Sequence, residues 1–234
     1  MEPRQVRSAA DARELVESRG VQHVKVGVFD IDGIMRGKYI SRDKFLSALD
    51  GGFGFCDVVL GWDCQDQLYD NVKYTGWHTG YPDAPVRLLP DTCRTLPFED
   101  NGLFFLGEFS PPGEAVCSRG LLRRVLERAR AMGFEAYVGF EYEFFVFKET
   151  PESVREKNYR GLTPMAPGWF GYSVIRNSTG NAFYRQLLDH CRDMDMAIEG
   201  LHEETGPGVM EAAITVDKAL AAADKAALFK TFAK

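Results

Sequence analysis

The chain has 234 residues, of which 45% are hydrophobic, and it can therefore bury the core of one or two domains. Its formal net charge of −6 argues against a surface that binds nucleic acid or anionic membrane, because such surfaces are basic. No apolar run reaches membrane-spanning length, and the five cysteines never form a Cys-x-x-Cys pair, which is typical of reduced thiols rather than of a disulfide framework or zinc site. We therefore expect a cytoplasmic protein that binds neither nucleic acid nor membrane.

The N-terminal segment predicts a helix followed by a hairpin. Residues 8–19 suit a short helix, and Gly20 supplies the expected C-terminal stop. Residues 24–29 are strand-like, and a turn at Asp32-Gly33 leads to a second strand near residues 36–40.

The next seventy residues predict a small β-rich domain. Residues 41–110 alternate short apolar runs with Gly, Pro and Asp. The segment Pro111-Pro112-Gly113 cannot continue a helix or a central strand. We place a domain boundary there, so that residues 1–112 form one domain and residues 113–234 a second.

The second half predicts alternating helices and strands. Apolar residues at helical spacing mark a helix over 121–132, and strand-like sequence follows over 134–147. The remaining elements, in order, are a long loop over 150–177, a helix over 179–196, strands near 197 and 212, and a last helix over 217–234. This order is typical of the opening of a larger α/β layer, and the last helix has no capping glycine, so we expect the chain to be the front part of something longer.

The first acidic cluster is Glu141-Tyr142-Glu143. Residues two apart on a strand point to the same face, so both carboxylates share one side. The flanking sequence is almost continuously apolar, which favours a buried strand over the alternative of a solvent-facing edge strand. Buried carboxylates need a cationic partner, and a hard divalent metal ion is the obvious one.

The second acidic cluster lies in residues 202–211. Glu204 and Glu211 flank a Gly-Pro-Gly turn that can bring both carboxylates towards one point, although an acidic surface loop is the alternative. His202 is followed four residues later by Gly206, so the zinc-protease helix motif is absent. Carboxylates with little histidine or thiol predict Mg²⁺ or Mn²⁺ rather than zinc, and such clusters commonly serve phosphoryl transfer from a nucleotide.

A third motif, Asp30-Ile31-Asp32-Gly33, resembles the first motif of haloacid-dehalogenase-like phosphatases, in which the first Asp is the nucleophile. Those enzymes also need a later Gly-Asp-x-x-x-Asp motif, which is absent here. The Arg36-Gly37-Lys38 stretch that follows suits a hairpin better than the helix of that fold. We keep the phosphatase as a minor alternative.

The two acidic clusters together resemble the glutamine synthetase superfamily, and particularly its ligases that join glutamate to polyamines or alkylamines. Residues 139–147 are similar to the Glu-x-Glu-Phe-Phe strand of that family, and residues 198–211 to its second metal-binding stretch. The resemblance implies an α+β fold, in which a β-grasp-like N-terminal domain precedes the first part of a glutamine synthetase-type α/β catalytic domain.

The resemblance also implies site residues and a reaction. Glu143, Glu204 and Glu211 would hold a metal ion near glutamate, Glu141 would contribute to a second ion on the nucleotide phosphates, and Glu199 would lie close to the nucleotide. The implied reaction joins an amine to the γ-carboxylate of glutamate through γ-glutamyl phosphate, with ATP as co-substrate and Mg²⁺ or Mn²⁺. The resemblance further implies a ring-shaped homo-oligomer, in which each active site is shared between the β-grasp domain of one subunit and the catalytic domain of its neighbour.

The chain departs from the family pattern at the amine end. Val209 replaces the usual Gln, and the Asp-Gly-Ser-Ser segment associated with ammonia is not recognisable. The stretch of residues 56–63 stands in its place and ends in Trp62 and Asp63. An aromatic ring beside an acid suits an organic ammonium, through cation–π contact and charge pairing. We therefore expect an amine other than ammonia to contact Trp62 and Asp63, with core packing as the alternative role of Trp62.

A last departure concerns length. Members of the family continue well beyond the equivalent of Lys234, so we expect this polypeptide alone to lack independent ligase activity. The competing hypothesis is a non-catalytic relative that keeps the fold for a binding or structural role. Retention of all four metal-position glutamates favours the enzyme.

Overall fold

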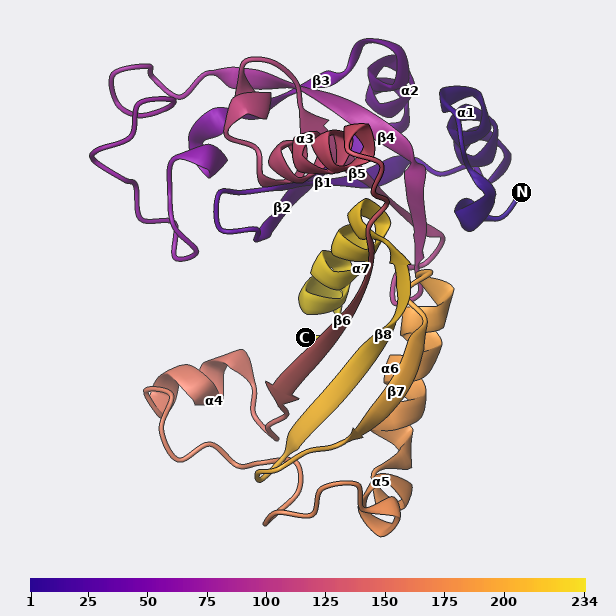
Figure 1. The fold of residues 1–234 in the computed structure, drawn as a ribbon, viewed down its shortest axis with the longest axis vertical. Helices are drawn as coiled ribbons and strands as arrows, with labels where there is room; N and C mark the ends of the chain where they lie inside the picture. Colours follow the sequence, from indigo (N-terminus) through magenta and orange to yellow (C-terminus); the bar gives the residue numbers. More distant parts are fainter.

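The computed structural model describes residues 1–234 and contains two β-sheets (Figure 1). The first sheet has five strands in the order β2-β1-β5-β4-β3, and the second has three in the order β6-β8-β7. The strands are β1 His23–Phe29, β2 Met35–Ser41, β3 Phe53–Cys56, β4 Asp83–Leu96, β5 Gly102–Phe109, β6 Tyr137–Phe145, β7 Ile198–Glu203 and β8 Val209–Lys218.

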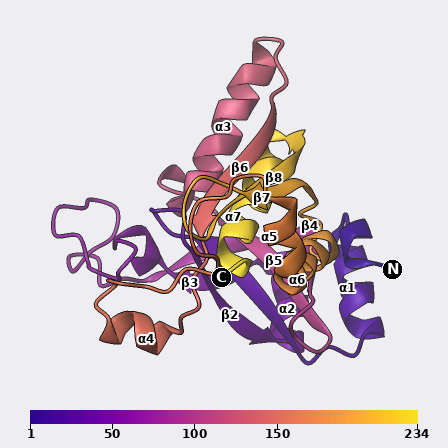
Figure 2. The same ribbon diagram turned by 90° about the horizontal axis from the view of Figure 1, so that it is seen from below.

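Seven α-helices connect and cover these strands. They are α1 Ala9–Ser18, α2 Arg42–Gly51, α3 Ser118–Ala131, α4 Pro151–Glu156, α5 Val174–Thr179, α6 Asn181–Asp193 and α7 Ala219–Phe232. None of them combines the length and apolar character needed to cross a lipid bilayer. Figure 2 shows α3 and the start of β6 projecting together from the rest of the molecule.

The first sheet is covered on both faces, and its central strand β5 is buried along almost its whole length. Because side chains alternate along a strand, Leu103 and Phe105 enter a core with α1 and α2 on one face. Phe104 and Leu106 enter a second core on the other face, with α6, α7 and the second sheet. The two sheets therefore share a core, although residues 111–113 separate them along the chain.

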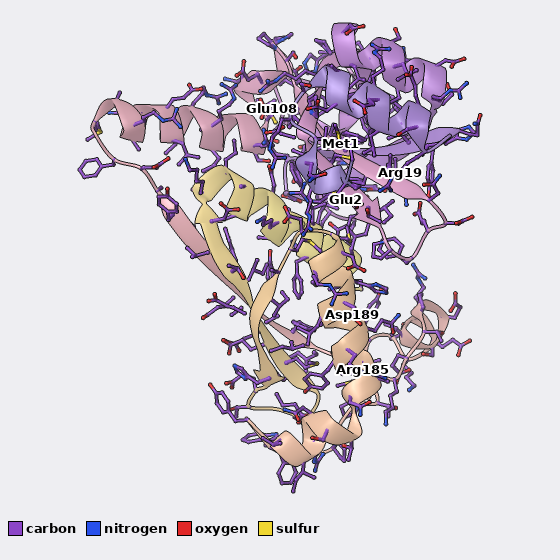
Figure 3. The ribbon with its side chains drawn as sticks, turned by 90° about the vertical axis from the view of Figure 1, so that its right-hand side faces the viewer. Met1, Glu2, Arg19, Glu108, Arg185 and Asp189 are labelled. Carbon is purple, nitrogen blue, oxygen red and sulfur yellow. The ribbon has the colours of Figure 1, made fainter.

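The second sheet is covered on one face only. Leu187 of α6 and Phe229 of α7 pack with Ala212 and Ile214 of β8 in the second core, and Arg185 and Asp189 point outward from α6 (Figure 3). β6 is an edge strand, and its residues alternate between exposed and half-buried. The expectation of a buried strand over 134–147 was therefore wrong, because only the face that carries Tyr142 and Phe144 meets a helix.

Most expected elements are present. The hairpin of β1 and β2, the helix that ends before Gly20, and the helices α3, α6 and α7 are confirmed within a few residues. The purely β-rich interpretation of 41–110 was wrong at 42–51, where Ser41 caps α2 by accepting a hydrogen bond from the Lys44 amide at 3.3 Å.

The segment after β6 is organised around Glu149. Its carboxylate accepts hydrogen bonds from the Lys157 ammonium at 2.6 Å, the Ser153 hydroxyl at 2.6 Å and the Thr163 amide at 2.7 Å. The contact with Lys157, followed by those with Ser153 and Thr163, lowers the pKa of Glu149 to about 2.

This lowered pKa predicts a pH-dependent contribution to stability. A Glu in the unfolded chain has a pKa of about 4.3, so the ionised Glu149 stabilises the fold above that pH. The contribution is lost progressively as the pH falls towards the folded pKa of about 2. We expect Glu149→Gln to unfold at lower denaturant than wild type near neutral pH, with the difference shrinking through this window. Exposed Glu156→Gln is the control, and a difference for Glu149→Gln that does not change with pH would contradict the prediction.

Candidate functional site

The open face of the second sheet carries a row of polar side chains. Glu143 of β6 lies directly opposite Glu211 of β8, and His202 of β7 lies opposite Glu211 from the other side. Directly paired residues in a sheet point to the same face, so these three side chains lie side by side. Glu141 shares the face with Glu143 because it is two residues away on the same strand.

Three of the side chains in this region are close enough to hold one metal ion. His202, Glu204 and Glu211 each offer a ligand atom, and these atoms all lie within 4.8 Å of one another. All three residues are half-buried, whereas Glu141 and Glu143 are exposed and lie outside this group. The structure thus brings together two of the four predicted metal carboxylates and leaves the other two on the same face beside them.

A tight loop places Glu204 next to Glu211. The Glu204 amide donates to the Val209 carbonyl at 3.0 Å and closes the hairpin between β7 and β8. Gly208 has a φ of 73°, and a Cβ atom there would lie 2.7 Å from the Val146 carbonyl oxygen. The position therefore requires glycine, and this glycine lets the loop pack against the end of β6.

The charge of this face is not balanced by the protein. No Lys or Arg forms an ion pair with Glu141, Glu143, Glu204 or Glu211, and the only basic group within ion-pair distance is His202, whose Nε2 lies 3.8 Å from Glu211 Oε2. Clustered, half-buried carboxylates are costly without a cation. The oxygen ligands suit Mg²⁺ or Mn²⁺ and the imidazole nitrogen favours a transition-metal ion, so Mn²⁺ fits both.

Tyr172 and His202 are site residues that the sequence argument did not find. The Tyr172 ring stacks on the His202 ring with centroids 4.3 Å apart, and its amide donates to the Glu203 carbonyl at 2.9 Å. The nearby Glu204 carboxylate raises the pKa of Tyr172. His202 could have been found, because His202 and Glu204 are two apart in strand-like sequence. Tyr172 lies in a loop and left no such signal.

The predicted nucleotide contact, Glu199, lies at an irregularity of β7. The pairing with β8 shifts between Ile198 and Gly200, so Glu199 is the extra residue of a bulge, and its side chain is exposed. Bulges redirect side chains and occur often beside active sites.

The predicted amine contacts lie elsewhere in the chain. Trp62 and Asp63 belong to the loop between β3 and β4, which lies beside the first sheet (Figure 1). The Trp62 ring is half-buried against the first core and stacks on the Arg36 guanidinium, whose Cζ lies 4.9 Å from the ring centroid.

The phosphatase alternative is contradicted at Asp30. This residue is fully buried, and its carboxylate accepts hydrogen bonds from Arg36 Nε at 2.8 Å and from two backbone amides. A strand rather than a helix follows it. A buried and fully paired carboxylate cannot serve as an accessible nucleophile.

Comparisons with known proteins agree with this fold. The family model described as glutamine synthetase, catalytic domain, matches residues 115–234. The chain is 44% identical over 210 residues to type-1 glutamine synthetase 2 of Dictyostelium discoideum, covering 88% of this chain and 40% of the relative. It is 32% identical over 225 residues to glutamate–isopropylamine ligase of a Pseudomonas species, covering 93% of this chain and 48% of the relative.

A solved complex of GmaS with ADP has the same fold, with a TM-score of 0.74 at 17% identity, over 95% of this chain and 48% of that one. The chain thus spans less than half the length of each of these proteins. Because the catalytic-domain model matches more than half of its residues, the chain belongs to the glutamine synthetase family.

Proposed function

We propose that this chain carries the metal-binding and nucleotide-binding face of an ATP-dependent ligase that joins an amine to the γ-carboxylate of glutamate. The observation that supports it best is the grouping of His202, Glu204 and Glu211 within 4.8 Å on a sheet face whose carboxylates have no Lys or Arg partner. Membership of the glutamine synthetase family supports γ-glutamyl ligation as the reaction.

The proposed chemistry has two steps. An oxygen of the glutamate γ-carboxylate attacks the γ-phosphorus of ATP and ADP leaves, which gives γ-glutamyl phosphate. The nitrogen of the amine then attacks the γ-carbonyl carbon, phosphate leaves, and the nitrogen loses a proton. Bound divalent ions would neutralise charge on the phosphates. In this proposal the residues nearest glutamate are Glu143, His202, Glu204 and Glu211. The residues towards the nucleotide are Glu141 and Glu199.

We further propose that the amine is an organic amine, with Trp62 and Asp63 at its site. The likeness to glutamate–isopropylamine ligase supports an organic amine. The higher identity to a protein named as a glutamine synthetase makes ammonia the competitor that an assay must distinguish.

Architecture and assembly complete the proposal. We assign residues 1–112 to a β-grasp-like domain and residues 113–234 to the first part of the catalytic domain. The β1–β2 hairpin, whose first strand pairs in parallel with β5, supports the β-grasp assignment. We also propose a ring-shaped homo-oligomer in which the loop of Trp62 meets the acidic face of a neighbouring subunit, since the two belong to different sheets of one chain.

The test is a ligase assay on the gene product purified from its source. We expect ADP and a γ-glutamyl amide to form only with ATP, glutamate, Mn²⁺ and an amine, with isopropylamine or putrescine preferred over ammonia. Preference for ammonia would overturn the substrate assignment alone. Mn²⁺ binding without ADP formation for any amine would favour the non-catalytic relative.

A further inference from the structure

The loop that carries Trp62 and Asp63 is closed by its own hydrogen bonds. Trp62 and Leu68 form a β-bridge, and the Asp63 amide donates to the Gln67 carbonyl at 3.0 Å. The Asp63 Oδ1 atom accepts from the amides of Gln65 and Gln67 at 2.8 and 2.9 Å. The loop thus occupies one carboxylate oxygen of Asp63 and leaves Oδ2 without a hydrogen bond.

A single side chain on the neighbouring hairpin fixes this loop. The Arg36 guanidinium lies 2.6 Å from Asp66 Oδ1, donates to the Asp63 carbonyl at 3.4 Å, and covers the Trp62 ring. Its Nε donates to Asp30 Oδ2 at 2.8 Å. One planar group therefore contacts three residues of the loop and one of the hairpin, which a lysine ammonium cannot do.

The guanidinium itself cannot move freely. Asp30 is fully buried, and its other oxygen accepts from the amides of Asp32 and Ile34 at 3.0 and 2.8 Å. If Arg36 left this position, the Asp30 carboxylate would remain buried without a cation, which is strongly unfavourable. The hairpin therefore sets the position of Arg36, and Arg36 in turn sets the position of the loop.

The Trp62 ring is not available as a binding surface for a cationic ligand. Arg36 covers the ring, Trp62 packs against the first core, and its indole Nε1 is buried without an acceptor. An ammonium on this ring would also lie next to a guanidinium. Asp63 is different, because its Oδ2 accepts no hydrogen bond and the neighbouring Arg36 guanidinium is already paired with Asp30 and Asp66.

We propose that Arg36 is the positioning residue of the amine site: it holds the loop of residues 61–69 so that Asp63 Oδ2 faces the ammonium of the substrate, and Trp62 belongs to this clamp rather than to the ligand contact. The inference rests on the proposed function, which places the amine at this loop. It changes the expected role of Trp62 from a cation–π contact to a structural one.

The clamp is tested first by amide hydrogen exchange on the 234-residue chain. We expect Arg36→Gln to speed exchange at Asp63, Gln65 and Gln67 by roughly tenfold or more, because charged hydrogen bonds to the loop are lost. Arg36→Lys keeps the charge beside Asp30, so its exchange rates should lie between those of wild type and Arg36→Gln. Arg42→Gln, at a side chain that is 40% exposed, is the matched control and should exchange like wild type.

Exchange in Arg36→Gln that is as slow as in wild type would overturn the clamp. If Arg36→Gln does not fold, Asp66→Ala replaces it, because this side chain is 56% exposed and the Asp30 pair remains intact. Faster exchange confined to residues 61–69 then supports the clamp, and unchanged exchange overturns it.

The positioning role is tested by titrating isopropylammonium and following the amide signals of residues 61–69. We expect the affinity to fall by roughly fivefold or more in both Asp63→Asn and Arg36→Lys, and to change little in Trp62→Phe. A loss in Asp63→Asn without one in Arg36→Lys would overturn the positioning role. Equal affinity in wild type and Asp63→Asn, with the loop still loosened by Arg36→Gln, would instead show that the proposed amine site is wrong while the clamp exists.

Discussion

Replacement of Arg119 by alanine is expected to lower the free energy of unfolding of this chain by about 3–5 kcal/mol. Arg119 lies in the first turn of α3 and is buried between β5 and α7. Its Nε and Nη2 atoms donate to the two oxygens of Asp224 on α7, both at 2.9 Å, and Nη1 donates to Glu108 of β5. Figure 3 shows Glu108 beside α3, where this helix meets the first sheet.

The size of the effect comes from what the substitution leaves behind. Asp224 has no other ion-pair partner, and burial already raises its pKa. Without Arg119, its carboxylate must either stay charged in the interior or take up a proton, and both cost free energy. Glu108 is less affected, because Arg87 and Arg123 also contact it.

Denaturant unfolding measures the change, and two variants separate its causes. The double variant Arg119→Met with Asp224→Leu removes both charges and should recover most of the lost stability, since apolar replacement of a buried ion pair is often neutral. Arg192→Ala removes pairs on the surface of α6 and should cost less than about 1 kcal/mol. A loss below about 1 kcal/mol in Arg119→Ala would contradict a central role of this buried pair.

Local patterns in the sequence were sufficient to predict most helices and the β1–β2 hairpin. The first helix has a capping residue at Ser8 and a glycine with positive φ at position 20, both of which act within a few residues. The missed helix α2 carried the same kind of signal, a serine before it and a glycine after it, with Phe45 and Ala48 as its buried face. Its short apolar run could not be told from a strand by periodicity alone.

The site depended on pairings that local sequence does not contain. Glu143 and Glu211 are 68 positions apart, and they meet only because β6 pairs with β8. The edge position of β6 likewise follows from the order of the strands, which the local sequence does not contain. The apolar composition of β6 alone therefore suggested, wrongly, that the strand is buried on both faces. The hairpin loop around Gly208 is local, and there the expected approach of Glu204 to Glu211 is present in the structure.

The second large effect is expected at the acidic face. Glu204→Gln and Glu211→Gln should each weaken Mn²⁺ binding by about 10- to 100-fold or more, because even groups that only support a metal ligand have effects of that size. The amide cannot supply the charge of the carboxylate, and both residues belong to the group of ligand atoms within 4.8 Å. Glu143→Gln should weaken binding less, since Glu143 is exposed and lies outside that group.

Glu203→Gln is the matched control for the metal prediction. Glu203 adjoins Glu204 in sequence, but it is buried beside the Tyr184 hydroxyl and outside the group of ligand atoms, so its substitution should leave Mn²⁺ affinity unchanged. Calorimetric titration gives the affinities. A binding-linked shift in unfolding provides a second readout, since Mn²⁺ at a hundred times its dissociation constant should stabilise wild type by about 2.7 kcal/mol. Equal affinities in wild type, Glu204→Gln and Glu211→Gln would remove the metal from this face and, with it, the proposed ligase chemistry.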